Sequence, residues 1–322
     1  MADFKVEIAD YAAYAKFLSD NPPDNPYSLL PLLEAYRDAF STDFQLLLIM
    51  RNEVPVASSA LFAGKRFFQP TIKLMPLRIY DGVHFRILEE SKFQKHEQER
   101  LSALQSLEKY LESNFAFHQM VFPPGFYDLR SYQWSDARVI PQYTYVVELS
   151  NFSEEHYTKS LKEVLRAAEH SGLIAGAGGV EDLVSLQQIA YGRHRRRSPV
   201  SAGVLHKLLS GLNLTGLLDI KCVRNRSSDV VSAMALLRTN LNTFFYVAGT
   251  DAAAEKGASH LLYHEILKSE KEKGICSVDF CGANTPSINL FKSAFGPRLE
   301  IYFRVWRANR LPTRLVSLVK KI

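Results

Sequence analysis

The stretch 277–296 places a carboxylate inside an apolar strand and follows that strand with a polar turn. Asp279 lies within the strand, where a buried carboxylate is costly unless it is paired or used. Gly282 would let a ligand approach the backbone of the turn closely, and Thr285 or Ser287 could cap the helix that follows. A strand end, a glycine turn and a helix start are how α/β enzymes build their sites. The alternative is a strand, turn and helix that only pack.

A second candidate lies just upstream, at the start of a helix that the pattern predicts over 256–273. Two antiparallel strands are expected before this helix, over 230–238 and 243–249. Gly257 and Ala258 stand near the helix start, where small residues let an anion approach the exposed N–H groups and the positive end of the helix dipole. The spacing therefore predicts a site for an anionic part of a ligand.

A third candidate is the aromatic segment 126–134, which also carries Asp128. Its members Tyr127, Arg130 and Trp134 could line a substrate pocket, because aromatic and guanidinium groups bind flat or anionic ligands. The alternative is a loop packed on a domain interface.

Charge is distributed unevenly along the chain. Residues 1–150 carry 15 Lys and Arg against 19 Asp and Glu, and residues 151–322 carry 24 against 15, so the net charges are −4 and +9. The densest run of positive charge is 193–197, which includes Arg195. This run could clamp a phosphate-bearing substrate, or it could be a solvated helix end. The second half is therefore the expected binding region for a polyanionic ligand.

Length and composition predict a folded, cytoplasmic protein of two domains. The 322 residues suffice for two domains of about 150 residues each, and 47% of them are hydrophobic. Residues 1–11 lack the features of a secretory signal, and no stretch approaches about 18 uninterrupted apolar residues. The cysteines Cys222, Cys276 and Cys281 are too few and too irregular for a disulfide framework or a zinc site. We expect reduced thiols and no bound metal.

Periodicity predicts two halves of similar element order. The first half is expected to run helix, three strands, a long amphipathic helix over 89–114, and a strand. The second half is expected to run strand, three helices, three strands, helix, strand, helix, strand, with its first helix beginning at Ser153. Two such halves indicate a duplicated unit, which we divide into domains 1–136 and 137–322.

This order, with its ordered set of short motifs, resembles the FemAB-like members of the GNAT acyltransferase superfamily, including the group related to cellulose-biosynthesis acetyltransferases. The pattern FK-x-x-FG after the strand and turn is the most distinctive part. The resemblance spans most of the chain and is strongest over about 125–305. The residues that carry it are Asp128-Leu129-Arg130 to Trp134, Tyr143-Thr144-Tyr145, Leu165-Arg166-Ala167-Ala168, Val278-Asp279-Phe280, and Phe291-Lys292 to Phe295-Gly296.

The resemblance implies an α/β (α+β) fold of tandem GNAT-like domains, each a mixed, mostly antiparallel sheet flanked by helices, with a transfer groove between the domains. The first domain would be degenerate, and the second would hold the donor. Families of this kind use acyl-CoA or aminoacyl-tRNA as donor and an amine as acceptor. The residues 254–259 read AEKGAS, which lacks the leading Arg or Gln of the usual CoA-pyrophosphate loop and ends in Ser. No long heptad segment interrupts the second half, whereas FemABX enzymes often carry a coiled-coil arm.

The same resemblance implies roles for individual residues in amine acylation, which needs a deprotonated nucleophile, an oriented donor and hydrogen-bond donors for the oxyanion. Asp279 is the expected base or amine-orienting carboxylate, Lys292 the expected contact to the donor's carbonyl or phosphate, and Tyr246 the expected acid for a thiolate. Their alternatives are a paired acid in the sheet, an exposed helix lysine and a core tyrosine. The expected donor-binding residues are Val247, Ala248, Gly249, Gly257, Ala258 and Asn284. The expected acceptor-binding residues are Tyr127, Arg130, Trp134, Arg166, Arg195 and Phe291.

Acyl-CoA, with acetyl-CoA as its simplest form, is the expected co-substrate, and a small-molecule or precursor amine is the expected acceptor. A FemABX-type aminoacyl-tRNA-dependent transferase acting on a cell-wall precursor is the second hypothesis. A non-catalytic binding module is the third, because fold does not fix function. No DNA partner is expected. The tail 307–322 alternates apolar and basic residues and could lie on anionic lipid, or it could dock on its own domain.

Overall fold

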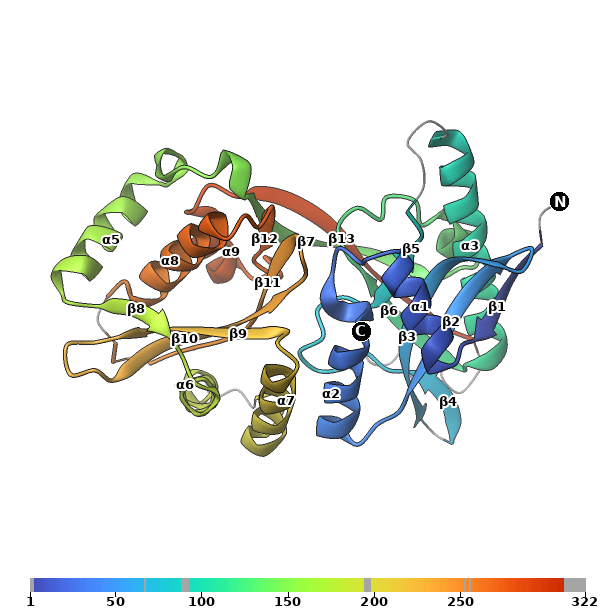
Figure 1. Cartoon of the computed structure of the whole chain (residues 1–322), viewed down its shortest axis with the longest axis horizontal. Helices are drawn as coiled ribbons and strands as arrows, with labels where there is room; N and C mark the ends of the chain where they lie inside the picture. Colours follow the sequence, from blue (N-terminus) through green and yellow to red (C-terminus); the bar gives the residue numbers. More distant parts are fainter. Residues whose placement is uncertain are drawn as a thin grey trace. The chain divides into compact units, whose positions relative to one another are not determined.

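The computed structural model divides into two compact units (Figure 1). It describes residues 3–66, 68–87, 93–193, 198–251, 253–254 and 256–309. The first unit comprises Met1–Arg37, Ser41–Gln142 and Ile301–Ile322, and the second comprises Asp38–Phe40 and Tyr143–Glu300. The strands β7 (Arg138–Glu148) and β13 (Arg298–Ala308) each begin in one unit and end in the other.

The first unit is a mixed sheet with helices on its surface. Its strand order is β1-β2-β3-β4-β6-β13, and β5 pairs with β3. All of the pairings within β1 to β5 are antiparallel, and β4 pairs parallel with β6. The elements are β1 (Phe4–Ile8), α1 (Tyr11–Asp20), α2 (Leu30–Phe40), β2 (Phe44–Arg51), β3 (Val54–Arg66), β4 (Gln69–Ile72), β5 (Gly82–Phe85), α3 (Phe93–Asn114), β6 (Phe117–Phe122) and α4 (Arg130–Trp134).

The second unit is built on the sheet order β7-β12-β11-β10-β9-β8. Its pairings are antiparallel except for that of β11 with β12, which is parallel. After β7 the elements are α5 (Lys159–His170), β8 (Ile174–Ala177), α6 (Val180–Arg193), α7 (Ala202–Leu214), β9 (Leu218–Arg224), β10 (Val230–Arg238), β11 (Asn242–Thr250), α8 (Ala258–Glu272), β12 (Ser277–Asp279) and α9 (Pro286–Ser293).

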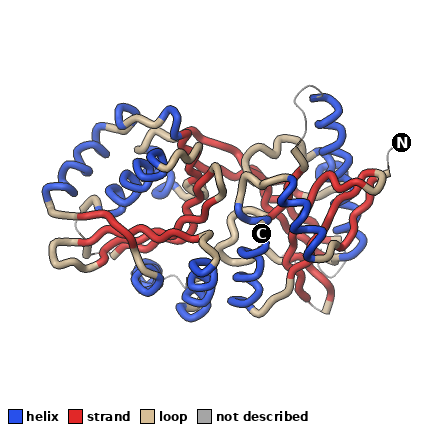
Figure 2. Tube along the Cα trace, in the orientation of Figure 1, coloured by secondary structure: helices blue, strands red, loops and turns tan. Residues whose placement is uncertain are grey.

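Helices cover both faces of the second unit's sheet, as Figures 1 and 2 show. α6 packs on β10 and β11 and α7 packs on β9, while α8 packs on the opposite side and contacts α5. α5 is strongly amphipathic because Leu161, Leu165 and Ala168 recur at helical spacing, and all three are buried. The predicted fold class, a mixed and largely antiparallel α/β fold flanked by helices, is confirmed.

One predicted helix start and several short elements differ from the structure. The helix predicted from Ser153 is a 3-10 turn over Glu154–His156, and α5 begins later because the hydroxyl of Thr158 accepts from the backbone N–H of Leu161. The short strands β1, β5 and β8 and the short helix α4 were not predicted, because four or five residues carry too little periodicity to detect.

Gly249 on β11 is the point where α6 approaches the sheet most closely. A Cβ atom built on Gly249 would lie 2.5 Å from the backbone N of Gln187 and 2.5 Å from the carbonyl carbon of Leu186. Real Cβ atoms do not approach backbone this closely, so α6 can lie against β11 only because this side chain is missing.

We predict that Gly249→Ala lowers the free energy of unfolding by about 2 kcal/mol, because α6 must move away from the sheet. The matched control is Gly203→Ala on α7, where an added Cβ meets nothing within 4 Å. That change should leave the stability unchanged or raise it by up to about 1 kcal/mol. Urea unfolding of both variants measures the difference, and equal stabilities would refute the packing role of Gly249.

Candidate active site

The parallel pair β11–β12 separates after three residues. Asn242, Thr243 and Phe244 pair with Ser277, Val278 and Asp279. Beyond Asp279 the chain leaves β11 and follows β7, since the N–H of Phe280 donates to Tyr145 O at 2.8 Å and that of Ala283 donates to Tyr143 O at 2.7 Å. In the part of the chain that the structure describes, residues 245–250 of β11 therefore have no paired strand on this edge. We call this edge the strand parting.

A β-bulge lies at the start of the strand parting. Val247 pairs with Ala235 and Phe245 pairs with Leu236, so Tyr246 is the extra residue on β11. Ala248, beyond the bulge, is exposed, and it lies on the same face as Thr250. The Thr250 hydroxyl lies 2.9 Å from that of Ser259 on the first turn of α8, so the exposed face at Ala248 adjoins the N-terminus of that helix.

Asp279 is paired inside the turn that ends β12. It is 5% exposed, and its Oδ1 accepts from the Thr144 hydroxyl at 2.6 Å and from the N–H of Cys281 at 2.7 Å. The Thr144 hydroxyl oxygen in turn accepts from the N–H of Gly282 at 2.9 Å. Cys281 and Gly282 have φ values of 56° and 89°, so the carboxylate holds a left-handed turn against β7. These contacts favour the paired structural acid over the expected base.

Lys292 is buried beneath the same turn. Its ammonium group donates to the carbonyl oxygens of Phe280, Cys281 and Gly282 at 2.6, 3.3 and 2.7 Å. Burial lowers its pKa, and the nearby Cys281 and Asp279 oppose that shift. With three N–H donors and three backbone acceptors, the side chain is fully used in holding the turn. The alternative drawn from the sequence, that Lys292 is an exposed helix residue, is wrong, because its side chain is only 7% exposed.

An aromatic cluster forms the floor beside the strand parting. Phe245 of β11 stacks on Phe280 with a centroid distance of 4.9 Å, and Tyr263 of α8 meets the edge of Phe245 at 4.7 Å. Phe291 and Phe295 of the FK-x-x-FG pattern extend the cluster to α9, at 4.9 and 5.4 Å from Tyr263. Phe291, expected to bind the acceptor, is thus half-buried in this cluster.

His260, which was not among the residues expected from the sequence, extends the same cluster at the first turn of α8. Its ring lies 4.6 Å from that of Phe291 and is stacked 6.3 Å from that of Phe295. Burial and the positive charge of Lys256 lower its pKa, which favours the neutral imidazole. Its place three residues after Gly257, at a helix start, was the available signal.

Close packing against α5 explains why position 257 is a glycine. Its φ is 103°, and an added Cβ would lie 3.0 Å from Ala168 Cβ and 3.1 Å from both Val164 Cγ1 and Val164 O. α5 therefore covers the side of Gly257 from which a side chain is missing. The small Ala168 of the LRAA motif is explained by the same contact.

The other expected donor residues differ in exposure. Val247, Gly249 and Ala258 are buried, and Gly249 faces α6. Ala248 is exposed at the strand parting. Asn284 is exposed, and its Oδ1 accepts from the N–H of Tyr143 at 2.9 Å, so this side chain also ties the turn to β7.

The expected acceptor residues are spread over both units. Tyr127 and Trp134 of the first unit are 77% and 60% exposed, and Arg130 pairs with Asp128 while lying 5.8 Å from the Trp134 ring. Arg166 is exposed on α5 of the second unit. Arg195 lies outside the described residues. The structure thus brings Phe291 to the strand parting, and the other roles remain predictions.

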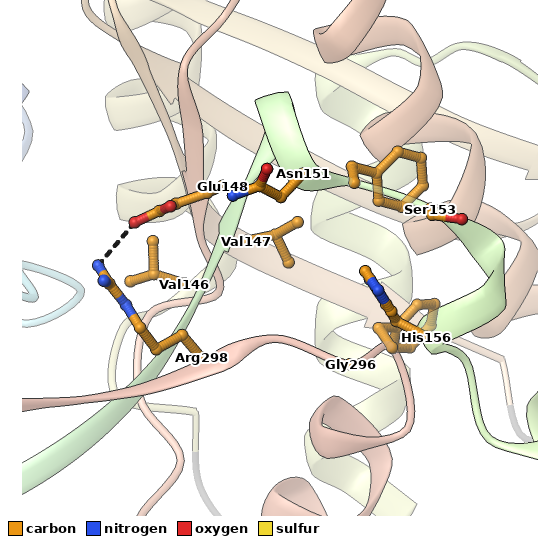
Figure 3. Close-up of a pocket in the computed structure, with 10 residues that line it drawn as sticks. Val146, Val147, Glu148, Asn151, Ser153, His156, Gly296 and Arg298 are labelled. Carbon is orange, nitrogen blue, oxygen red and sulfur yellow. Dashed lines mark ion pairs between the residues drawn. The ribbon is translucent and has the colours of Figure 1, made fainter.

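A small pocket lies where β13 begins (Figure 3). Its volume is about 190 Å³, below the 300–1,000 Å³ typical of ligand pockets. Glu148 and Arg298 form an ion pair of 2.9 Å at one end, and His156 and Gly296 lie at the other (Figure 3). A Cβ on Gly296 would lie 2.7 Å from His156 O, so the final glycine of FK-x-x-FG allows this close approach.

The described residues provide neither a metal site nor a membrane-spanning helix. No group of three His, Cys, Asp or Glu side chains there could hold a metal ion. Burial, reinforced by the carboxylate of Asp279, raises the pKa of the Cys281 thiol well above its usual value, so this group is no nucleophile at neutral pH. No helix in the described ranges has the length and apolar character to cross a bilayer.

Comparisons with known proteins point to one fold. No protein-family model matches the chain, and no curated protein matches it. The crystal structure of FemX aligns with a TM-score of 0.68 at 11% identity and covers 99% of this chain and 100% of its own. The C-terminal domain of a protein from Agrobacterium fabrum, described as a lysylphosphatidylglycerol synthetase, gives 0.61 at 13%, covering 97% and 96%.

A tandem GNAT protein from the clavulanic acid biosynthesis pathway gives a TM-score of 0.54 at 9% identity, covering 97% of this chain and 99% of its own. At these identities the likeness shows the fold. The chain has the tandem GNAT fold that FemX shares, and the resemblance to FemAB-like proteins is confirmed at that level.

We predict that Lys292→Met destabilises the protein by about 3 kcal/mol, because three backbone carbonyls lose their charged donor. The control is Lys268→Met on the exposed side of α8, which should change the free energy of unfolding by less than about 0.5 kcal/mol. Urea unfolding measures both. A Lys292→Met protein as stable as the wild type would contradict the structural role. The role expected from the sequence, a contact to the donor, would then be favoured.

Proposed function

We propose that this chain, with its FemAB-like tandem GNAT fold, is an acyltransferase that moves an acyl group from an activated ester or thioester to an amine. The observation that carries the proposal is the strand parting, where β11 keeps an edge without a paired strand beside the first turn of α8. FemX and the lysylphosphatidylglycerol synthetase have the same fold, and the second name states a product in which a lysyl group is joined to a lipid.

The strand parting suits a donor that binds in an extended form. An extended chain can add to an open sheet edge through main-chain hydrogen bonds, and its reactive carbonyl is then held at a fixed place along the strand. The exposed face at Ala248 leaves room for such a chain, while the aromatic floor excludes water beneath it. Positioning of this kind is the main contribution that a site without a covalent intermediate can make.

Acyl-CoA is the first donor to consider, with acetyl-CoA as its simplest member. The resemblance carries this choice, and the basic second half of the chain supports an anionic donor. The acceptor would be a small-molecule or precursor amine.

An aminoacyl-tRNA donor is the second candidate, and the packing of Gly257 favours it. In GNAT enzymes the CoA pyrophosphate would bind at this helix start, but here α5 packs against Gly257 so closely that an added Cβ would lie 3.0 Å from Ala168 Cβ. A donor that places only its acyl end at the strand parting does not need that space.

We predict that Ala248→Arg lowers transfer at least tenfold, because the long side chain fills the strand parting. The matched control is Leu241→Arg, also an exposed residue but at the opposite end of β11, which should retain activity. The wild type is incubated with acetyl-CoA, longer acyl-CoAs or aminoacyl-tRNA and a panel of amines, and acylated products are detected by mass spectrometry.

Thermal unfolding with each donor gives an independent measure of binding, since a ligand that binds the folded state raises the melting temperature. Stabilisation by one donor class, lost in Ala248→Arg, supports that donor. If no donor gives a product or stabilises the protein, the proposal that the chain is an enzyme is refuted, and the non-catalytic binding module remains. Product formation that survives in Ala248→Arg would place the transfer elsewhere.

A further inference from the structure

The imidazole of His260 is the one titratable ring that lies on the first turn of α8. The ring is half-buried against Phe291 and Phe295 of the α9 segment. Among the residues that the structure describes, neither ring nitrogen has a hydrogen-bond or ion-pair partner. An imidazole that is fixed by packing and has unused nitrogens is available to a bound substrate.

The groups around His260 keep it in the basic, neutral form. Phe291 of α9 and Phe295 just after this helix present their rings to His260, and Lys292, between them in sequence, is bound to backbone carbonyls. Lys256, just before α8, lowers the pKa of the imidazole together with burial. The positive end of the α8 dipole acts in the same direction.

The neighbouring histidine on α8 is in a different state. His264 Nδ1 lies 3.2 Å from the Tyr157 hydroxyl, and its Nε2 lies 3.8 Å from Glu154 and 3.7 Å from Glu265. Its nitrogens are thus already engaged. Asp279 and Lys292 are likewise used in holding the turn. His260 is therefore the base that these contacts leave available on the α8 side of the strand parting.

We propose that His260 is the general base of the acyl transfer, an inference that rests on the proposed function. It lies one residue from Ser259, whose hydroxyl marks the contact between α8 and the exposed face of β11. No carboxylate pairs with it in the described chain, so its proton affinity is set by the apolar rings and by positive charge.

The step balances without an added reactant. The amine nitrogen attacks the donor carbonyl, a C–N bond forms, and the carbonyl π electrons move to oxygen. A lone pair of the His260 imidazole takes the proton from the new ammonium. The oxyanion then reforms the C=O bond and expels the thiolate or alkoxide, which receives the same proton from the imidazolium. The products are an amide and a free thiol or alcohol, and His260 is neutral again.

The test is the pH dependence of transfer in the full-length protein with a donor that the wild type uses. In the wild type, kcat/KM expressed on the neutral form of the amine should fall on the acid side with an apparent pKa below that of a free imidazole, because the base is lost when it is protonated. His260→Gln should lower kcat at pH 7.5 about 100-fold or more and abolish that acid limb, with the donor KM within about threefold. Imidazole in solution should partly restore His260→Ala.

The control is His206→Gln, an exposed α7 histidine paired with Glu181, which should keep wild-type rates. Thermal unfolding of the His260 variants checks that they are folded. The proposal is overturned if His260→Gln keeps at least a third of the wild-type kcat. It is also overturned if kcat is lost but the acid limb remains and imidazole does not restore activity. Either result leaves the proposed function standing, whereas a wild type that is inactive with every donor removes both.

Discussion

A buried ammonium group maintains the place where β12 leaves β11. Lys292 binds three successive carbonyls, those of Phe280, Cys281 and Gly282, while the Asp279 carboxylate binds the N–H of Cys281 from the other side. Positive and negative charge thus hold one left-handed turn, and the turn is tied to β7 through Thr144. Without this network the chain after Asp279 could continue beside β11, and the open edge on which the proposed chemistry depends would close.

Three glycines of the second unit each allow another segment to pack closely, and this packing shapes the surface at the strand parting. Gly249 admits α6, Gly257 admits α5, and Gly296 admits the backbone at His156, each by the absence of a Cβ. Packing of both helices and the turn against these positions leaves Ala248 and the first turn of α8 as the accessible surface of the strand parting. The same close packing accounts for the LRAA and FG motifs. In the sequence these motifs carry the family resemblance, and in the structure they allow close backbone contacts.

The strand, turn and helix of 277–296 and the tandem fold could be predicted from the sequence, because apolar periodicity, the N-cap residue Thr285 and the ordered motifs are local signals. The hydrogen-bond partners of the charged groups could not be predicted from the sequence. Thr144 bonds to Gly282 across 138 residues of sequence, and a single sequence holds no record of that contact. From the sequence, Lys292 is therefore expected to contact the donor or to lie exposed on a short helix, whereas its partners are three backbone carbonyls. His260 was missed because its interest comes from what surrounds it: the rings of Phe291 and Phe295 and, among the described residues, no paired acid.

The most direct test of the account is a crystal structure of the protein with a stable bisubstrate analogue that joins the donor to the amine. We predict electron density for the analogue along residues 245–250 of β11, with its amide linkage between Ala248 and the His260 ring and with the turn at Gly282 unchanged. Density that avoids this edge, for example in the small pocket beside Gly296 or wholly within the first unit, would contradict the central claim.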